Sequence, residues 1–312
     1  MTFWQNYHLA NDITDALHTL ADAPGEASFI AGGTDLLLDI QQGRHPHVHT
    51  LIDVTQIPEL CQLEVRDQNL YIGAAVPLNR IKNAPEVQWH ARALAEAAAL
   101  IGGPQVRNTA TLGGNVGHAL PAGDGTIALL ALAAEAEIAS LEGRRRLPVE
   151  ELFTGPGKSI LKPRNELLVG FHLPAIEKGD GSAFRRVMRP QGVAIAILNM
   201  GIWIKRVGVV IQDIRISIGP AGPTPFRARA AEASLRGKTV QKKNLPEAVE
   251  AVLLEAKFRT SPHRSTAEYR RHLVAPLLEE TLLAAWDVSM EKSIETVMDL
   301  NQGQYSQDKL PV

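Results

Sequence analysis

The sequence predicts a chain of mixed helices and strands, either α/β or α+β, that is divided into two or three subdomains. Strand-like and helix-like patterns alternate along the chain, which favours these two fold classes. Its 312 residues are more than a single hydrophobic core usually organises. Residues 174–182 have the composition of a linker, and the order of elements changes after them, so we expect a domain boundary there.

The first part of the chain is predicted to mix short strands with helices. Residues 28–31 form an apolar run that leads directly into two glycines, as a buried strand followed by a tight turn would. Residues 86–101 are rich in alanine and are predicted as one helix that Gly102-Gly103-Pro104 stops. The other expected helices are 12–23, 36–40 and 124–135, and the other expected strands are 50–54, 63–65, 70–76, 137–141, 146–148 and 167–173.

The second part is predicted as an antiparallel sheet with helices packed on it. Three strands are expected at 183–188, 193–204 and 207–218. Three helices are expected at 227–236, 245–256 and 267–286. From about Ser293 the sequence is polar, and we expect a loose or partner-docked tail.

Charge and cysteine content exclude several classes of site. The net charge is −2, which does not favour nucleic acid, and Gly143-Arg144-Arg145-Arg146 is interpreted as a solvated hairpin turn. Cys61 is the only cysteine, so this chain alone cannot form a disulfide, an iron–sulfur cluster or a zinc–thiolate site. No stretch approaches 18 consecutive apolar residues and no secretory signal pattern begins the chain, so a cytoplasmic location is expected.

Two glycine loops carry the strongest chemical signal. The first is Ala31-Gly32-Gly33-Thr34-Asp35 and the second is Thr111-Leu112-Gly113-Gly114-Asn115. Adjacent glycines let backbone N–H groups converge on an anion, and a hydroxyl adds a further donor. Two such loops can hold both phosphates of a dinucleotide, although each could also be only a tight turn. Neither loop matches a Rossmann or Walker A motif.

Several other polar residues leave alternatives open. Asp124 follows Pro121-Ala122-Gly123 and could accept hydrogen bonds from ribose or ribityl hydroxyls, or cap a helix. His45, His47 and His49 are spaced for a metal but lie in a loop, so no metal site is predicted. Tyr269-Arg270-Arg271-His272 could be a phosphate patch, but a role in structure and subunit contacts is favoured. No residue is predicted to be catalytic.

Four stretches in the same order resemble the FAD-binding medium subunit of the molybdenum hydroxylases, the enzymes of xanthine dehydrogenase, aldehyde oxidoreductase and carbon monoxide dehydrogenase type. They are 31–36, the long run from Pro104 to Asn115, Pro121 to Asp124, and 267–273. The resemblance covers roughly residues 1–290. It implies an α+β fold: a vanillyl-alcohol-oxidase-like (PCMH-type) FAD-binding domain at 1–176, with subdomains 1–55 and 56–176. A C-terminal antiparallel sheet covered by helices then follows at 182–290, with a tail at 291–312.

The resemblance also implies which residues meet FAD. Asp124 is expected at sugar hydroxyls, Ile101 beside the adenine or the ring system, Leu168 near the cofactor and Arg185 close to the flavin ring. The pyrophosphate is expected to be held by Phe29, Ile30, Ala31, Gly32, Gly33, Thr34, Asp35 and Leu36 together with Thr111, Leu112, Gly113, Gly114 and Asn115.

In this family the medium subunit works with two partners. The resemblance implies a large molybdenum-pterin subunit and a small subunit with two [2Fe-2S] clusters, assembled as (αβγ)₂. Electrons are expected to pass from the clusters through FAD to NAD, a quinone, a ferredoxin or oxygen. The alternatives are a stand-alone PCMH-type flavin oxidase or dehydrogenase, and a scaffold that has lost its flavin.

Overall fold

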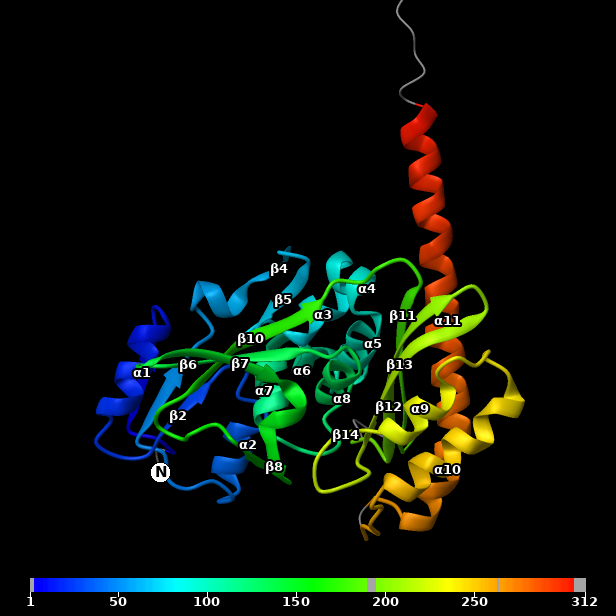
Figure 1. Cartoon of the computed structure of the whole chain (residues 1–312). Coiled ribbons are helices and arrows are strands. Elements are labelled where there is room, and N and C mark those ends of the chain that lie inside the picture. The colour runs from blue at the N-terminus through cyan, green and yellow to red at the C-terminus, as the bar shows by residue number, and fades with distance from the viewer. Residues whose placement is uncertain (1–2, 190–194, 263, 306–312) are drawn as a thin grey trace, which may run out of the picture.

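The computed structural model describes residues 3–189, 195–262 and 264–305, and three larger sheets organise them (Figure 1). The first is a parallel sheet in the order β1-β3-β2, formed by β1 (Asn6–Leu9), β2 (Ala27–Ile30) and β3 (Thr50–Asp53). Two helices connect these strands, α1 (Ile13–Asp22) and α2 (Leu36–Gln41). Asp12 caps α1 by accepting from the Asp15 N–H at 2.8 Å, as its short side chain favours.

The second sheet is antiparallel and has the order β4-β5-β10-β6-β7. Its strands are β4 (Leu63–Arg66), β5 (Asn69–Gly73), β6 (Glu135–Ser140), β7 (Gly143–Pro148) and β10 (Leu167–Pro174). The helices between β5 and β6 are α3 (Leu78–Asn83), α4 (Pro85–His90), α5 (Arg92–Leu100), α6 (Pro104–Thr109), α7 (Leu112–Gly117) and α8 (Asp124–Ala131). A two-stranded sheet of β8 (Phe153–Gly155) and β9 (Lys158–Ser159) and the 3₁₀ turns Pro58–Cys61 and Val149–Leu152 complete this part.

The third sheet is the antiparallel sheet that the sequence predicted. Its order is β11-β12-β13-β14, formed by β11 (Asp180–Val187), β12 (Leu198–Val207), β13 (Val210–Gly219) and β14 (Phe226–Arg227). The helices that follow are α9 (Arg229–Leu235), α10 (Leu245–Glu255) and α11 (Ala267–Tyr305), with a 3₁₀ turn at Lys242–Asn244. The α+β fold class is therefore confirmed.

Alternating side chains let this third sheet pack on both faces. Met200, Ile202 and Ile204 lie in the core shared with α9, α10 and α11, whereas Trp203 belongs to the core of the part that contains the two glycine loops. A Cβ on Gly181 would overlap the Ala285 carbonyl, so α11 lies directly on β11. The sheet is therefore held between α5 and α8 on one face and the C-terminal helices on the other.

Three sequence predictions need correction in detail. The single helix expected at 86–101 is two helices, because Ala91 leaves the helical region at φ −140° and ψ 51°. The arginines Arg144 to Arg146 lie in the edge strand β7, not in a turn. The tail from Ser293, expected to be loose or partner-docked, is not loose at first but continues as helix to Tyr305, and docking on a partner stays a prediction. Residues 193–194 of one predicted strand lie outside the described residues.

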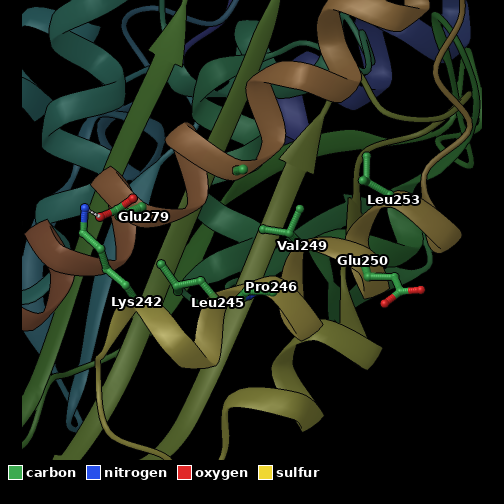
Figure 2. A pocket seen from close by; sticks show the side chains of 8 residues that line it. Lys242, Leu245, Pro246, Val249, Glu250, Leu253 and Glu279 are labelled. Atoms are coloured by element: carbon green, nitrogen blue, oxygen red, sulfur yellow. Dashed lines mark ion pairs between the residues drawn. The ribbon is translucent and has the colours of Figure 1, made fainter.

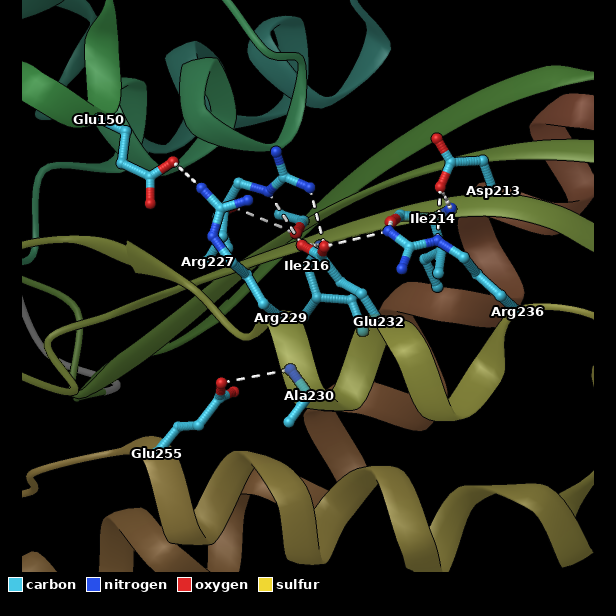
Figure 3. Close-up of polar contacts among 12 residues, drawn as sticks. Glu150, Asp213, Ile214, Ile216, Arg227, Arg229, Ala230, Glu232, Arg236 and Glu255 are labelled. Carbon is cyan, nitrogen blue, oxygen red and sulfur yellow. Dashed lines mark hydrogen bonds and ion pairs between the residues drawn. The ribbon is translucent and has the colours of Figure 1, made fainter.

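A buried carboxylate joins helix α9 to the sheet (Figure 3). Glu232 is 1% exposed and accepts from the Ile216 N–H at 2.9 Å. It also accepts from Arg227 Nε at 2.9 Å and Nη2 at 2.8 Å. The two hydrogen bonds from one guanidinium group orient the pair, and the backbone donor satisfies a further lone pair.

We expect Glu232→Ala to destabilise the chain by about 3 kcal/mol, because it leaves Arg227 without its buried counter-charge. The free energy of unfolding in urea is the measurement. Glu247→Ala is the matched control, since its side chain is 66% exposed in the pair with Lys238 and exposed pairs contribute at most about 1 kcal/mol. Equal losses in the two variants would contradict the role given to Glu232.

Candidate functional site

The first glycine loop presents free backbone donors. Strand β2 ends at Ile30 and α2 begins at Leu36, so the loop is the start of a helix. Gly33 has φ +67°, a left-handed conformation that glycine adopts without steric cost. Among the described residues, the N–H groups of Gly32 and Thr34 find no hydrogen-bond acceptor. Unpaired N–H groups at a helix start form a ready site for an anion.

The two predicted loops meet in the structure. A Cβ on Gly32 would overlap the Thr109 carbonyl and lie 2.8 Å from the Ala110 Cα. The Ala110 carbonyl accepts from the Leu78 N–H at 2.9 Å, which fixes this stretch of chain. The first loop therefore lies against the residues that lead into the second loop, although about eighty positions separate the loops in the sequence.

The second loop is built differently from the first. Thr111 is the N-cap of α7, and its Oγ1 accepts from the Gly114 N–H at 3.1 Å. The N–H of Gly113 donates to the Ala74 carbonyl at 2.8 Å and that of Leu112 to Val76 at 3.2 Å. Asn115 Oδ1 accepts from the Gly125 N–H at 3.1 Å. Most of its backbone donors are thus used to hold the loop in place, which leaves the Thr111 hydroxyl and the Asn115 amide nitrogen as donors.

Asp124 lies at the start of α8 and is 5% exposed. It does not cap the helix, because Gly123 occupies the N-cap position. Its carboxylate binds Arg186 Nη1 and accepts from Asn199 Nδ2 at 2.6 Å. Burial raises the pKa of Asp124, and the positive charge of Arg186 and the amide of Asn199 act in the opposite direction. Arg186 and Asn199 are site residues that sequence reasoning missed.

Unsatisfied polar atoms gather around this carboxylate. Arg186 Nε, Thr126 Oγ1 and Asn199 Oδ1 are buried and have no hydrogen-bond partner. Buried polar groups are rarely left in this state, since each costs free energy unless a ligand or water meets it. The residues present therefore fit a dinucleotide such as FAD. The free N–H groups of the first loop suit a pyrophosphate, and Asp124, with its unpaired polar neighbours, suits sugar hydroxyls.

The remaining predicted contacts are placed less directly. Ile101 follows α5, and its carbonyl accepts from Arg107 Nη1 at 3.2 Å. The preceding carbonyl, of Leu100, accepts from Arg186 Nη2 at 2.5 Å, so Ile101 lies near the Asp124 cluster.

Leu168 lies in β10 opposite Ile138 and is 7% exposed. Arg185 pairs with Glu96 at 2.9 Å and with Glu280 at 3.3 Å. Arg186, not Arg185, is the basic residue that the structure brings to Asp124. Phe29 and Ile30 end β2, and Leu36 packs with Ile30 in a small core.

A separate pocket lies between α10 and α11 (Figure 2). It has a volume of 420 Å³ and an apolar lining that includes Leu245, Val249 and Leu253. Lys242 and Glu279 form an ion pair of 2.9 Å at its edge. No glycine-loop residue lines it, so it is not the place where the predicted phosphate donors converge.

The described residues offer neither a metal site nor a membrane-spanning helix. They contain no cluster of three or more histidine, cysteine, aspartate or glutamate side chains arranged for a metal ion. No helix among them has the length and apolar character that crossing a membrane requires.

The chain matches two family models that together cover most of its length. Residues 3–176 match the FAD binding domain in molybdopterin dehydrogenase, and residues 182–285 match the CO dehydrogenase flavoprotein C-terminal domain. The xanthine dehydrogenase FAD-binding subunit of Escherichia coli O157:H7 is 32% identical over 282 residues, which are 90% of this chain and 95% of the relative. The carbon monoxide dehydrogenase medium chain of Hydrogenophaga pseudoflava is 30% identical, over 90% of the length of this chain and 96% of the length of that relative.

A solved structure of that Hydrogenophaga pseudoflava enzyme, in a form lacking the Mo-pyranopterin moiety of the molybdenum cofactor, has the same fold. It aligns with a TM-score of 0.85 and 30% identity over 91% of this chain and 97% of the other. The fold of this chain is thus that of a chain in a solved carbon monoxide dehydrogenase. The protein belongs to the FAD-binding medium subunits of the xanthine dehydrogenase and carbon monoxide dehydrogenase family, which are oxidoreductase subunits.

Proposed function

We propose that this chain is the electron-transferring subunit of a molybdenum hydroxylase, passing electrons from [2Fe-2S] clusters of a partner subunit through FAD to an external acceptor. The observation that carries the proposal is the first loop, which has unpaired N–H groups and packs at Gly32 against the chain entering the second loop. When bound, a flavin can accept and release electrons singly or in pairs. The single cysteine, Cys61, requires that any clusters lie on another chain.

In this proposal each part of the site has a defined task. The N–H groups of Gly32 and Thr34 bind the pyrophosphate, and the Thr111 hydroxyl and the Asn115 amide bind it from the other side. Asp124 accepts from sugar hydroxyls beside the positive charge of Arg186. Ile101 and Leu168 exclude water from the ring system, and Arg185 lies on the strand that borders it.

The proposal includes the assembly. A large molybdenum-pterin subunit and a small subunit with two [2Fe-2S] clusters complete an (αβγ)₂ complex. In it this chain supplies an FAD domain and a C-terminal domain, divided at residues 176–182. The acceptor is NAD, a quinone, a ferredoxin or oxygen. The cytoplasmic location expected from the sequence stays a prediction.

The first test is the visible absorption spectrum of the purified chain, followed by heat release of its cofactor. We expect a flavin spectrum, FAD in the supernatant and no iron. A colourless chain that also fails to take up added FAD would contradict the proposal. A flavin-bound chain that isolates without partner subunits and oxidises a substrate alone would favour a stand-alone flavin enzyme.

The glycine contact gives a sharper test. Gly32→Ala places a Cβ against the Thr109 backbone, so the two loops must separate and FAD affinity should fall about ten- to a hundredfold. Gly117→Ala is the matched control, because a Cβ there meets nothing within 4 Å and alanine in α7 should add about 0.5 kcal/mol of stability. Fluorescence titration with FAD measures both. Unchanged affinity in Gly32→Ala would mean that the loops do not hold the cofactor.

The relay can be tested in the assembled complex. We expect a complex carrying Gly32→Ala and depleted of FAD to take up electrons from dithionite into its clusters normally. Its reoxidation by the acceptor that serves the parent complex should be slow, and added FAD should restore the rate. Reoxidation at the parent rate without FAD would show that electrons leave by another route.

A further inference from the structure

Arg270 is a buried cation near the start of the longest helix. It lies in the first turn of α11, which begins at Ala267, and its side chain is only 2% exposed. Thr266 caps this turn by accepting from the Tyr269 N–H at 3.1 Å. Sequence reasoning favoured a role in structure and subunit contacts for 269–272, but a fully buried arginine normally requires a paired anion.

The contacts of Arg270 leave part of its guanidinium group unused. Nη1 donates to the Arg259 carbonyl at 3.2 Å, and Nε is buried without a partner. The chain from Arg259 folds back on itself through the Ser261 N–H, which donates to the Ser265 carbonyl at 2.9 Å. This fold keeps Arg264 close to the helix start.

A fourth arginine arrives from the sheet. Arg189 follows strand β11, and its Nη2 donates to the Arg264 carbonyl at 3.3 Å. Arg189 and Arg259 are exposed, Arg264 is partly buried and Arg270 is buried. We call these four residues the arginine cluster, in which hydrogen bonds join Arg189 to Arg264 and Arg270 to Arg259.

The arginine cluster carries unbalanced positive charge. Burial lowers the pKa of Arg270, and the charges of Arg259 and Arg264 lower it further. None of the four forms an ion pair with an aspartate or glutamate of the described residues. The N-terminus of α11 adds the positive end of a helix dipole, where cations are disfavoured. Among the described residues nothing balances this positive charge, so the arrangement favours the binding of an anion.

We propose that Arg189, Arg259, Arg264 and Arg270 form a binding site for a phosphate-class anion, which is either free phosphate or the phosphate group of a nucleotide. Guanidinium groups match phosphate oxygens with two parallel hydrogen bonds. Phosphate offers enough oxygens to meet several arginines at once, whereas a carboxylate offers two. The contacts of the cluster include no residue of the glycine loops, so the site does not rest on the proposed function.

Thermal unfolding tests the site in the full chain saturated with FAD, so that the glycine loops are filled. Phosphate is titrated at constant ionic strength against chloride, since a ligand of the folded state raises its stability with concentration. We expect stabilisation of the parent chain and about a tenfold weaker apparent affinity in Arg264→Gln. Arg271→Gln is the matched control, because Arg271 lies over the Phe258 ring at 5.8 Å instead.

Arg270→Gln separates binding from folding. Without phosphate it should unfold at no lower temperature than the parent, because it removes an unpaired buried charge, and with phosphate it should gain nothing. No stabilisation of the parent beyond chloride would overturn the proposal. Equal phosphate stabilisation in the parent, Arg264→Gln and Arg270→Gln would overturn it as well.

The source of the anion is resolved by a second ligand. ADP that binds as tightly as inorganic phosphate, with the same arginine dependence, indicates a free phosphate site. ADP that binds more tightly, with the same dependence, indicates a nucleotide. Acetate that stabilises as well as phosphate would overturn the assignment to phosphate, because a carboxylate of a partner chain would then suffice.

Discussion

The pairing of Asp124 with Arg186 and Asn199 is the interaction on which the arrangement of the molecule depends. It joins the first turn of α8 to strands β11 and β12, and thus joins the part with the glycine loops to the C-terminal sheet. All three groups are buried, so their charges and dipoles interact in a medium that screens them weakly. Removing Asp124 would leave Arg186 without its buried counter-charge, although Arg186 would still donate to the Leu100 carbonyl and Asn199 to the Ala122 carbonyl.

Two other contacts support that junction from either side. Asn115 connects the second loop to the Gly125 N–H, so the loop moves with α8. Glu96 on α5 accepts from the Phe184 N–H at 2.8 Å and pairs with Arg185. Neighbouring residues of β11 therefore face different partners: Arg185 reaches α5 and α11, and Arg186 reaches the acid. A strand that borders the site is thus held at both of its faces.

The close packing of the loops depends on glycine residues, which have no Cβ. Gly32 and Gly113 both lie where a Cβ would collide with neighbouring backbone or Ala74, and only glycine permits such close approach. The second loop has fewer free donors than the first, because its backbone N–H groups donate to the Ala74 and Val76 carbonyls. The first loop therefore keeps N–H groups free for a ligand, while hydrogen bonds hold the second loop in a fixed position beside it.

Local pattern by itself determined a good deal about this protein. The glycine pair after a buried strand indicated a loop, and the lone cysteine excluded an iron–sulfur cluster formed by this chain. The alternating apolar residues of β12 and β13 indicated the C-terminal sheet. These signals are local, because they depend on backbone freedom, residue counts and period. Only the tertiary structure decided that Arg186 and not Arg185 meets Asp124, and that N–H groups of the second loop donate to Ala74 and Val76. It also decided that Arg270 is buried with no acidic partner among the described residues. Each of these depends on which residues far apart in the sequence come into contact, and spacing along the sequence does not determine those contacts.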